Sequence, residues 1–143
     1  MSTTTPASAG APPGIQSSAM FEYLGRDVVE MDAVKGYVKA ICQARPEFCN
    51  PGGVIQGGFL TAMLDDVMSF AAVAHSGFTK VVPTLDFKAS FLAPVAVGDV
   101  TVEGSIVKSG RSIAYLEGKL YNSKGELAVI ASATTQYADM PKL

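Results

Sequence analysis

The sequence has few of the residues that metal sites and disulfide frameworks require. Its 143 residues include two cysteines, Cys42 and Cys49, and one histidine, His75. The six residues between the cysteines match neither a disulfide framework nor a zinc site, and we interpret both as unpaired thiols in a reducing compartment. We therefore expect no metal and no other cofactor.

Runs of like charge are also absent. The chain has 11 basic and 13 acidic side chains and a net charge of −2. Because these charges are scattered, no basic stripe can neutralise a phosphate backbone, and we expect no nucleic-acid partner. Residues 1–18 hold neither a charge nor an apolar block, so they resemble neither a signal nor a transit peptide. They are predicted to be a flexible tail before a single domain at 19–143.

Two acids interrupt the longest apolar run, from Gly57 to His75. The run has about the length of a membrane span, but Asp65 and Asp66 would each cost about 2.5–3.5 kcal/mol at the centre of a bilayer. The sequence therefore predicts a soluble cytoplasmic protein with no membrane partner. Apolar residues cover most of the circumference of the predicted helix, which is typical of a helix surrounded by protein.

The segments on either side of this helix favour β-strands. A short helix is predicted at 18–24, followed by one or two strands in VVEM and GYVKAICQ. After the long helix, LDFKASF, VTVEGSIVK, IAYLEGKLYN and LAVIASATTQY predict four strands joined by short connections, hence an antiparallel meander. In the first of them, alternation places one set of residues toward the core: Leu85, Phe87, Ala89 and Phe91.

Neither an internal repeat nor β-α-β alternation is present. The predicted fold class is therefore α+β, a long central helix wrapped by a curved antiparallel sheet of five to six strands. The chain also lacks a Gly-X-Ser-X-Gly elbow and a phosphate loop. These absences argue against a serine hydrolase and against a nucleotide enzyme.

Two glycines, Gly57 and Gly58, open the predicted helix. Backbone N–H groups at a helix start have no internal partner and lie at the positive end of the dipole, which suits a developing oxyanion. A glycine also lets a carbonyl group approach closely. The same pair is compatible with a tight turn against the sheet.

Asp65 shares a helix face with Thr61 and Ser69, four residues to either side, which makes a thin polar stripe on an apolar rod. Buried carboxylates seldom occur without a reason. Asp65 is therefore a general base, a nucleophile or a structural acid paired with a neighbouring group. Asp66 points about 100° away from it, and we interpret it as structural.

Three more residues allow both a chemical and a purely structural interpretation, and a fourth, His75, has a structural one. Asn50 either polarises a carbonyl or starts an Asn-Pro turn, and Thr84 either orients water or is an ordinary strand threonine. Arg111 either meets a phosphate of coenzyme A or is a hairpin-turn charge. His75 fits a histidine at the negative end of a helix dipole.

The order of NPGGVIQGG, a helix with LDD, PTLDFKASFLAPVAVGD and an SGRS turn resembles the hotdog-fold acyl-CoA thioesterases of the phenylacetate-degradation (PaaI) type. The resemblance extends from about Phe21 to Tyr137 and implies the hotdog fold. It also implies a catalytic site at four positions: Asn50, Gly57, Asp65 and Thr84.

One position departs from this family. The family usually has His-Gly-Gly where the chain has Gln56, Gly57 and Gly58. A glutamine can donate a hydrogen bond but cannot carry a proton, so Gln56 is expected to position the substrate. With Gly58 and Arg111, it makes up the predicted substrate-binding set.

Helix geometry predicts that two chains build one site. Eight residues place Asp65 about 12 Å from Gly57 along the helix, too far for both to touch one carbonyl. If both serve one reaction, Gly57 and Asn50 come from one chain and Asp65 and Thr84 from another, in a two-fold dimer with antiparallel helices. The resemblance implies such a homodimer, and often a tetramer of two dimers.

The expected function is hydrolysis of an acyl-CoA, with an acyl or aryl-acyl group, to the free acid and coenzyme A. The carbonyl would dock on the N–H of Gly57 with help from Asn50, while Asp65 of the partner chain activates water or attacks through an anhydride. Two alternatives stay open: a hotdog dehydratase or hydratase, and a non-catalytic acyl-CoA-binding module. Acyl specificity is expected from four apolar residues: Phe59, Met63, Met68 and Phe78.

Overall fold

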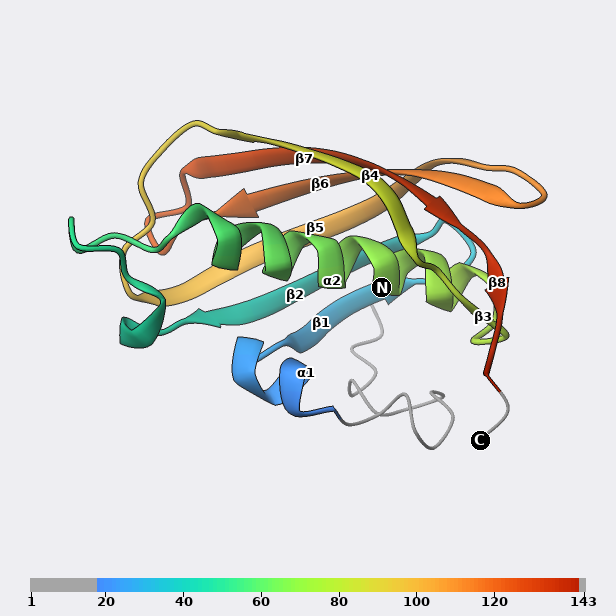
Figure 1. Cartoon of the computed structure of the whole chain (residues 1–143), viewed down its shortest axis with the longest axis horizontal. Coiled ribbons are helices and arrows are strands. Elements are labelled where there is room, and N and C mark those ends of the chain that lie inside the picture. Colours follow the sequence, from blue (N-terminus) through green and yellow to red (C-terminus); the bar gives the residue numbers. More distant parts are fainter. Residues whose placement is uncertain (1–17, 142–143) are drawn as a thin grey trace.

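A computed structural model describes residues 18–141 of the chain. In this part, a six-stranded sheet curves around one long helix (Figure 1). The helices are α1 (Ala19–Leu24), the 3-10 turn η1 (Pro46–Phe48) and α2 (Gly57–His75). The strands are β1 (Asp27–Asp32), β2 (Tyr37–Ala44), β3 (Lys80–Val81), β4 (Thr84–Phe91), β5 (Gly98–Ser109), β6 (Ile113–Tyr121), β7 (Leu127–Gln136) and β8 (Ala138–Asp139).

The start of the described chain concerns two predictions, the short helix at 18–24 and the flexible tail before it. Ser18 caps the predicted short helix, because its Oγ accepts a hydrogen bond from the Phe21 N–H at 3.3 Å. Gly25 ends that helix in a left-handed conformation, with φ of 63°. The rest of the predicted tail, residues 1–17, lies outside the described residues.

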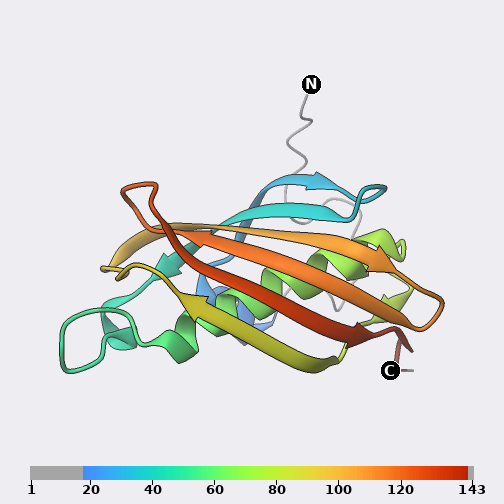
Figure 2. The same cartoon turned by 90° about the horizontal axis from the view of Figure 1, so that it is seen from above.

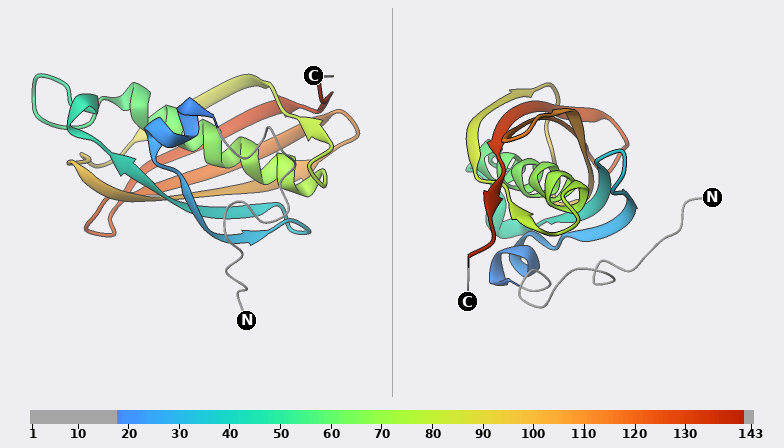
Figure 3. Two further views of the ribbon diagram at one scale, coloured as in Figure 1. Left: turned by 90° about the horizontal axis from the view of Figure 1, so that it is seen from below. Right: turned by 90° about the vertical axis from the view of Figure 1, so that its right-hand side faces the viewer.

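The main sheet runs β1-β2-β5-β6-β7-β4, with every neighbouring pair antiparallel. Seen from above, the strands cross over α2 (Figure 2), and in the end view they curl around it (Figure 3, right). The predicted α+β class, with a long central helix in a curved sheet of six strands, is confirmed. A two-stranded pair, β3 and β8, was not predicted.

The predicted four-stranded meander is wrong in its first connection. β5, β6 and β7 are consecutive neighbours, but β4 pairs with β7 at the edge of the sheet, with Phe91 opposite Val129. β2 occupies the other side of β5, with Ala40 opposite Val102. A short connection fixes strand direction but not the neighbour, and residues 92–97 can cross three strand spacings of about 4.8 Å each.

The helix α2 begins and ends where the apolar run predicts. Its close packing on the sheet depends on two glycines that face each other in β5 and β6, Gly104 and Gly118. A Cβ on Gly104 would lie 2.7 Å from the Met68 Cα, and one on Gly118 would lie 2.5 Å from the Met68 Sδ. By length and composition α2 could cross a membrane, and 50% of its apolar window is buried inside this fold.

β4 departs from simple alternation. Phe87 and Ala89 pack against the core as predicted, but Leu85 is 56% and Phe91 53% exposed. A bulge between Thr84 and Asp86 shifts the alternation and turns Leu85 away from the core. The ring of Phe91 lies beside the start of α2, at 3.0 Å from where a Cβ on Gly57 would stand.

Both cysteines are unpaired, as predicted. Cys42 is buried in β2, and burial together with the charge of Asp66 raises the pKa of its thiol to about 12, against the opposing effect of Arg26. A thiol with so high a pKa is inert as a nucleophile near neutral pH.

Candidate active site

The middle of α2 and the start of β4 bring Asp65 and Thr84 together. The Thr84 Oγ1 donates a hydrogen bond to the Asp65 Oδ1 at 2.7 Å. Since Pro83 precedes Thr84 and a bulge follows it, the local backbone aims the hydroxyl at α2 rather than along the ladder. The bond fixes the carboxylate through one oxygen, so Oδ2 is the oxygen available to take a proton from water.

Asp65 and Thr84 line a cavity of about 670 Å³ that crosses the outer face of α2. One wall is the segment from Val81 to Thr84, and the opposite wall is formed by α1 and Arg26. The view from below shows α1 lying across α2 on this side (Figure 3, left). The floor comes from α2 itself, through Ala62, Asp65, Asp66, Ser69, Phe70 and Val73.

Asp66 has a different partner. The Arg26 Nη1 donates to the Asp66 Oδ1 at 3.0 Å, and the two side chains are 8% and 5% exposed. Burial raises the pKa of Asp66 from 3.8 to about 6, while Arg26 lowers it and the charge of Asp65 raises it further. The ion pair agrees with the structural role predicted for Asp66.

Arg26 was not among the residues predicted from the sequence. It follows a short helix, 40 residues before Asp66, and no spacing rule connects the two positions. The one available signal was an acid within an apolar helix, which requires a partner of opposite charge. Nothing in the sequence selects among the 11 basic residues.

Gly57 lies at a second cavity, of about 450 Å³, formed by residues 54–55, the start of α2, and residues 91–95 at and after the end of β4. Gly57 is the first helical residue, with Gln56 as the N-cap in an extended conformation. Its N–H therefore has no partner within the helix. Gly58 is exposed, and a Cβ there would meet nothing within 4 Å. The exposed side chain of Gln56 makes no capping hydrogen bond.

Asn50 is engaged in its own loop. Its Oδ1 accepts hydrogen bonds from the N–H of Gly52 at 2.9 Å and of Val54 at 3.4 Å. This Asx turn is the plain reading of Asn-Pro. Its carboxamide nitrogen is the group left to donate to a substrate, and Asn50 itself does not line the cavity at Gly57.

The remaining candidates lie apart from both cavities. Arg111 is exposed in the turn between β5 and β6. His75 ends α2, and its Nδ1 is 2.9 Å from the Ala33 carbonyl oxygen, which ties the helix end to the turn after β1. Among the described residues, no group of His, Cys, Asp and Glu side chains is arranged to hold a metal.

The structure of the single chain does not place the predicted acyl-specificity residues at either cavity. Met63 and Met68 are fully buried in the core. Phe59 stacks on Phe48 with ring centroids 4.2 Å apart, and Phe78 packs against Phe70. None of the four predicted residues lines either cavity, because an apolar side chain on α2 is equally suited to the sheet-facing core and to a ligand cavity.

In one chain the two halves of the predicted site are separate. Asp65 and Thr84 line one cavity, Gly57 lines the other, and no residue is common to both. The helix between them is continuous, so the separation of about 12 Å along its axis holds.

Comparison with known proteins agrees with this architecture. The sequence model described as Thioesterase superfamily matches residues 52–129. A protein of Saccharolobus solfataricus, provisionally named an esterase, is 26% identical over 116 residues, which cover 81% of each chain.

Solved structures show the same likeness. A phenylacetic acid degradation-related protein of Ralstonia eutropha JMP134 is 30% identical, with a TM-score of 0.81 over 90% of this chain and 93% of its own. The PaaI protein of the E. coli phenylacetic acid degradation operon is 16% identical, with a TM-score of 0.79 over 87% of each chain.

Proposed function

Because the chain belongs to the thioesterase superfamily and is a thioester hydrolase, we propose that its substrate is an acyl-CoA and that two chains share each active site. The observation that carries this proposal is the hydrogen bond from Thr84 to Asp65 in a cavity large enough for an acyl group. A fixed carboxylate beside such a cavity is suited to activating water.

The position of β4 supports the shared site. Among the described strands β4 pairs with β7 alone, and its other edge is open. Exposed apolar side chains on it, Leu85 and Phe91, favour a further strand, and an open edge is a template for one. Pairing with β4 of a second copy about a two-fold axis would continue the sheet.

This pairing would also complete the site. The start of β4 holds Thr84 and through it Asp65, whereas its end holds Phe91 against Gly57. In an antiparallel pair the start of one strand lies beside the end of the other. Asp65 of one chain would therefore lie near Gly57 of the partner chain, and the separation within one chain would disappear.

The proposed mechanism uses the two halves together. The Gly57 N–H donates to the carbonyl oxygen, with the Asn50 amide as a second donor, while Asp65 of the other chain takes a proton from water. The water oxygen attacks the carbonyl carbon and forms a tetrahedral intermediate. The C–S bond then breaks, the free acid leaves, and the proton passes to the departing thiolate. Thr84 keeps Asp65 oriented throughout.

Direct attack by Asp65 through an anhydride uses the same geometry. The two routes differ in the origin of one oxygen atom. A single turnover in ¹⁸O-water places the label in the product acid if water attacks the carbonyl. It places the label in Asp65 if the carboxylate attacks and water then opens the anhydride at that side.

The structure disfavours a dehydratase. Such enzymes commonly use a histidine, and the one histidine of the sequence, His75, lies at the end of α2 and lines neither cavity. Turnover of a panel of acyl-CoAs, measured through the release of the free thiol, separates hydrolysis from hydration and from binding alone.

The remaining predicted residues belong to substrate binding. Gln56 and Gly58 would contact the thioester, and Arg111 would contact the coenzyme A phosphates. The cytoplasmic location, the absence of a cofactor and the tetramer stay predictions from the sequence.

The shared site is tested with a variant that removes one donor. Gly57→Pro deletes the N–H, and proline is well tolerated at the first helical position after an extended residue such as Gln56. Turnover should fall by about 10²–10³, the effect of one lost oxyanion donor. Gly57→Ala adds the same Cβ beside Phe91 but keeps the N–H, and should therefore lose much less turnover than Gly57→Pro.

Mixing Gly57→Pro with Asp65→Asn should then restore activity. Equal mixing makes half of the dimers hybrids, and each hybrid carries one intact site, so about a quarter of the wild-type activity should return. Neither parent alone should show it. Subunit exchange confirmed by mass spectrometry without any recovery would refute the shared site.

A further inference from the structure

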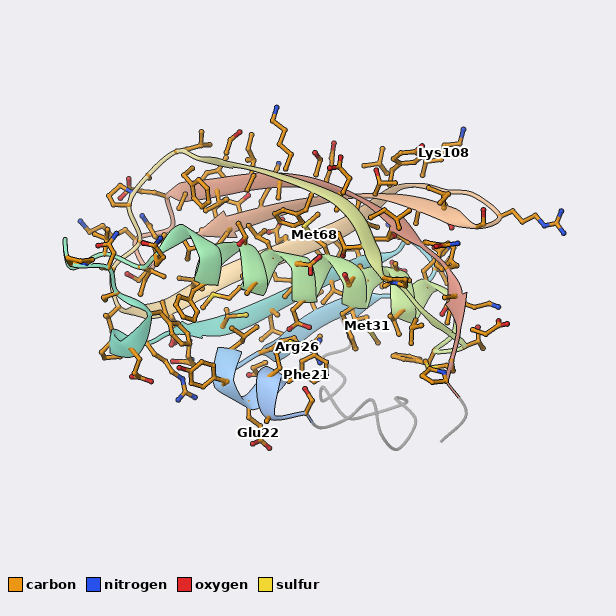
Figure 4. The ribbon with its side chains drawn as sticks, viewed as in Figure 1. Phe21, Glu22, Arg26, Met31, Met68 and Lys108 are labelled. Atoms are coloured by element: carbon orange, nitrogen blue, oxygen red, sulfur yellow. The ribbon has the colours of Figure 1, made fainter. Side chains whose placement is uncertain are left out.

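The two walls of the larger cavity are held in different ways. On one side Phe21 and Arg26 lie between α1 and α2 (Figure 4), and the Arg26 Nη1 donates to the Asp66 Oδ1 at 3.0 Å. This wall is fixed by buried side chains. On the other side the cavity is lined by residues 81–84, and this wall is fixed through its backbone.

The backbone of the second wall pairs with the C-terminal end of the described chain. β8 continues from the end of β7 and lies beside β3 (Figure 1), with Val81 opposite Ala138. Thr84 lies opposite Thr135 in the main sheet. The two pairs are in one register, since three residues separate their members on each strand. The segment before Thr84 is therefore aligned along one continuous edge.

The N–H groups along this edge alternate in direction. The Gln136 N–H donates to the Pro83 carbonyl oxygen at 3.1 Å, whereas the Tyr137 N–H donates to the Ser112 carbonyl oxygen at 2.8 Å. Because backbone groups alternate along an extended chain, the Ala138 N–H is directed at β3 again. The N–H of the residue after it is directed away from β3.

A bulge separates Thr84 from the rest of β4. Beyond the bulge the register shifts by one residue, so that Asp86 lies opposite Thr134. A bulge leaves one residue unpaired and interrupts the ladder. The place of Thr84 along β7 therefore follows the register of β3 with β8, and not that of the long pairing farther along β4.

The connection from α2 to β3 does not fix this segment by its own conformational preference. Gly77 and Phe78 both have a left-handed backbone, with φ of 71° and 61°, and this conformation is costly for a phenylalanine. Such a segment keeps its shape through the contacts around it. The Ser76 Oγ accepts from the Lys80 N–H at 3.2 Å at one end, and the pairing with β8 supplies the contacts at the other.

The hydrogen bond from Thr84 to Asp65 tolerates little displacement. The two oxygen atoms are 2.7 Å apart, and a shift of about 1 Å would lengthen the contact beyond the limit of a hydrogen bond. A slip of β3 by one residue along β8 would direct the hydroxyl to the other face. The accuracy of this bond therefore depends on the pairing of β3.

We propose that the backbone N–H groups of Gln136 and Ala138 are positioning groups for the reaction, which hold Thr84 against Asp65 by fixing the segment before β4. This inference rests on the proposed function, in which Asp65 takes a proton from water. Neither Gln136 nor Ala138 lines the cavity. Both act on the reaction through Thr84.

Ala138→Pro tests the inference, because it deletes the N–H directed at β3 and places a ring against the facing strand. The value of kcat should fall about tenfold, the loss expected for Thr84→Val, since both variants lose one hydrogen bond to a charged group. Ala138→Pro/Thr84→Val should be no slower than Thr84→Val alone, because the two changes remove the same contact. A defect elsewhere in the fold would multiply the two losses to about a hundredfold.

Asp139→Pro is the matched control. It places a proline one residue later, where the N–H is directed away from β3, and it removes the ion pair with Lys80. The side chains of Lys80 and Asp139 are 40% and 90% exposed, so this ion pair contributes little. The kcat of this variant should be close to that of the wild type.

Tyr137→Phe is a second test that leaves the backbone unchanged. The Tyr137 hydroxyl lies 2.8 Å from the Ser109 Oγ and holds the start of β8. Its loss should lower kcat less than Ala138→Pro does, and should have no effect in the Thr84→Val background. Tyr115→Phe removes the hydroxyl of an exposed tyrosine on β6 and should leave kcat unchanged.

Hydrogen exchange followed by mass spectrometry gives a readout that needs no substrate. In Ala138→Pro, residues 76–84 should exchange faster than in the wild type, while the exchange of α2 stays the same. A wild-type kcat in Ala138→Pro, multiplied losses in the double variant, unchanged exchange of residues 76–84, or an equal loss in Asp139→Pro would overturn the inference.

The choice of substrates separates this inference from the proposed function. The kcat values are measured with the best substrate of the acyl-CoA panel and with a simple thioester, S-phenyl thiobutyrate. A wild-type enzyme that cleaves the simple thioester but no acyl-CoA would overturn acyl-CoA as the substrate. The same variants would then decide the role of Gln136 and Ala138 on the simple thioester.

Discussion

Asp65 and Asp66 are neighbours on α2 and line the same cavity, yet their surroundings differ. Asp65 accepts a hydrogen bond from a neutral hydroxyl on an edge strand. Asp66 is paired with a guanidinium that is itself enclosed by two aromatic rings. In the proposed mechanism the first carboxylate exchanges a proton with water, whereas the second is held by a buried charge of opposite sign. The two aspartates differ in the group that each is bonded to, a hydroxyl or a guanidinium, and this difference separates their proposed roles.

The sharpest test of this contrast is Asp65→Asn. It should keep the fold and lower thioesterase turnover by about 10²–10⁴, the range for a lost general base. Asp66→Asn should lower turnover far less and change the melting temperature instead. Steady-state kinetics gives the turnover of both variants, and thermal unfolding gives their melting temperatures. Abolished turnover in Asp66→Asn at unchanged stability, with a mild effect in Asp65→Asn, would reverse the assignment.

Removal of Arg26 should act on stability. Arg26→Ala leaves the Asp66 charge buried without its partner, so the free energy of unfolding should fall by about 3–5 kcal/mol. Arg26→Met/Asp66→Leu removes both charges and should be close to the wild type or more stable. Urea unfolding monitored by circular dichroism gives both values. Equal losses in the two variants would mean that packing, and not the unpaired charge, is what Arg26 supplies.

The stability should also depend on pH through Asp66. Its pKa is raised from 3.8 to about 6, so between these values the folded state keeps a proton that the unfolded state releases. The contribution of this group is complete below about pH 4 and is lost as the pH rises through about 6. The free energy of unfolding of the wild type, relative to Asp66→Asn, should fall by on the order of 3 kcal/mol from pH 4 to pH 7. A constant difference would show that Arg26 compensates Asp66 fully.

The smallest expected effect belongs to Thr84. Thr84→Val keeps the shape of the side chain but deletes the hydrogen bond to the Asp65 Oδ1, and should lower kcat about tenfold, since a hydrogen bond to a charged group is involved. Thr84→Ser retains the hydroxyl and is the control. If Thr84→Val is as active as the wild type, Asp65 is oriented by other contacts.

The sequence was informative where the cause is local. The bounds of α2 follow from a continuous apolar period that begins at a glycine pair, and the strands follow from alternation and turn residues. The resemblance supplied the pairing of Asp65 with Thr84, which lie 19 residues apart. Neither periodicity nor spacing would have joined them.

The strand order, the ion pair of Arg26 and the cavity walls could not be predicted, because they depend on contacts between segments far apart in the sequence. β4 takes the edge beside β7 because β2 already occupies β5, a competition that no single strand reveals. Arg26 meets Asp66 through the placement of α1 over α2, and the cavity walls come from α1 and the segment before β4. Apolar residues of α2 alone cannot show which of them face the sheet and which face a ligand.

The paired glycines of β5 and β6 determine the distance between α2 and the sheet. Gly104 and Gly118 face each other across the ladder and receive Met68, one turn after Leu64 and three residues after Asp65. Since the atoms nearest a Cβ on Gly104 belong to the backbone of α2, a single methyl group there would lift the helix and carry Asp65 away from Thr84. Two positions without side chains, Gly104 and Gly118, thus determine how accurately Asp65, the proposed general base, is placed against Thr84.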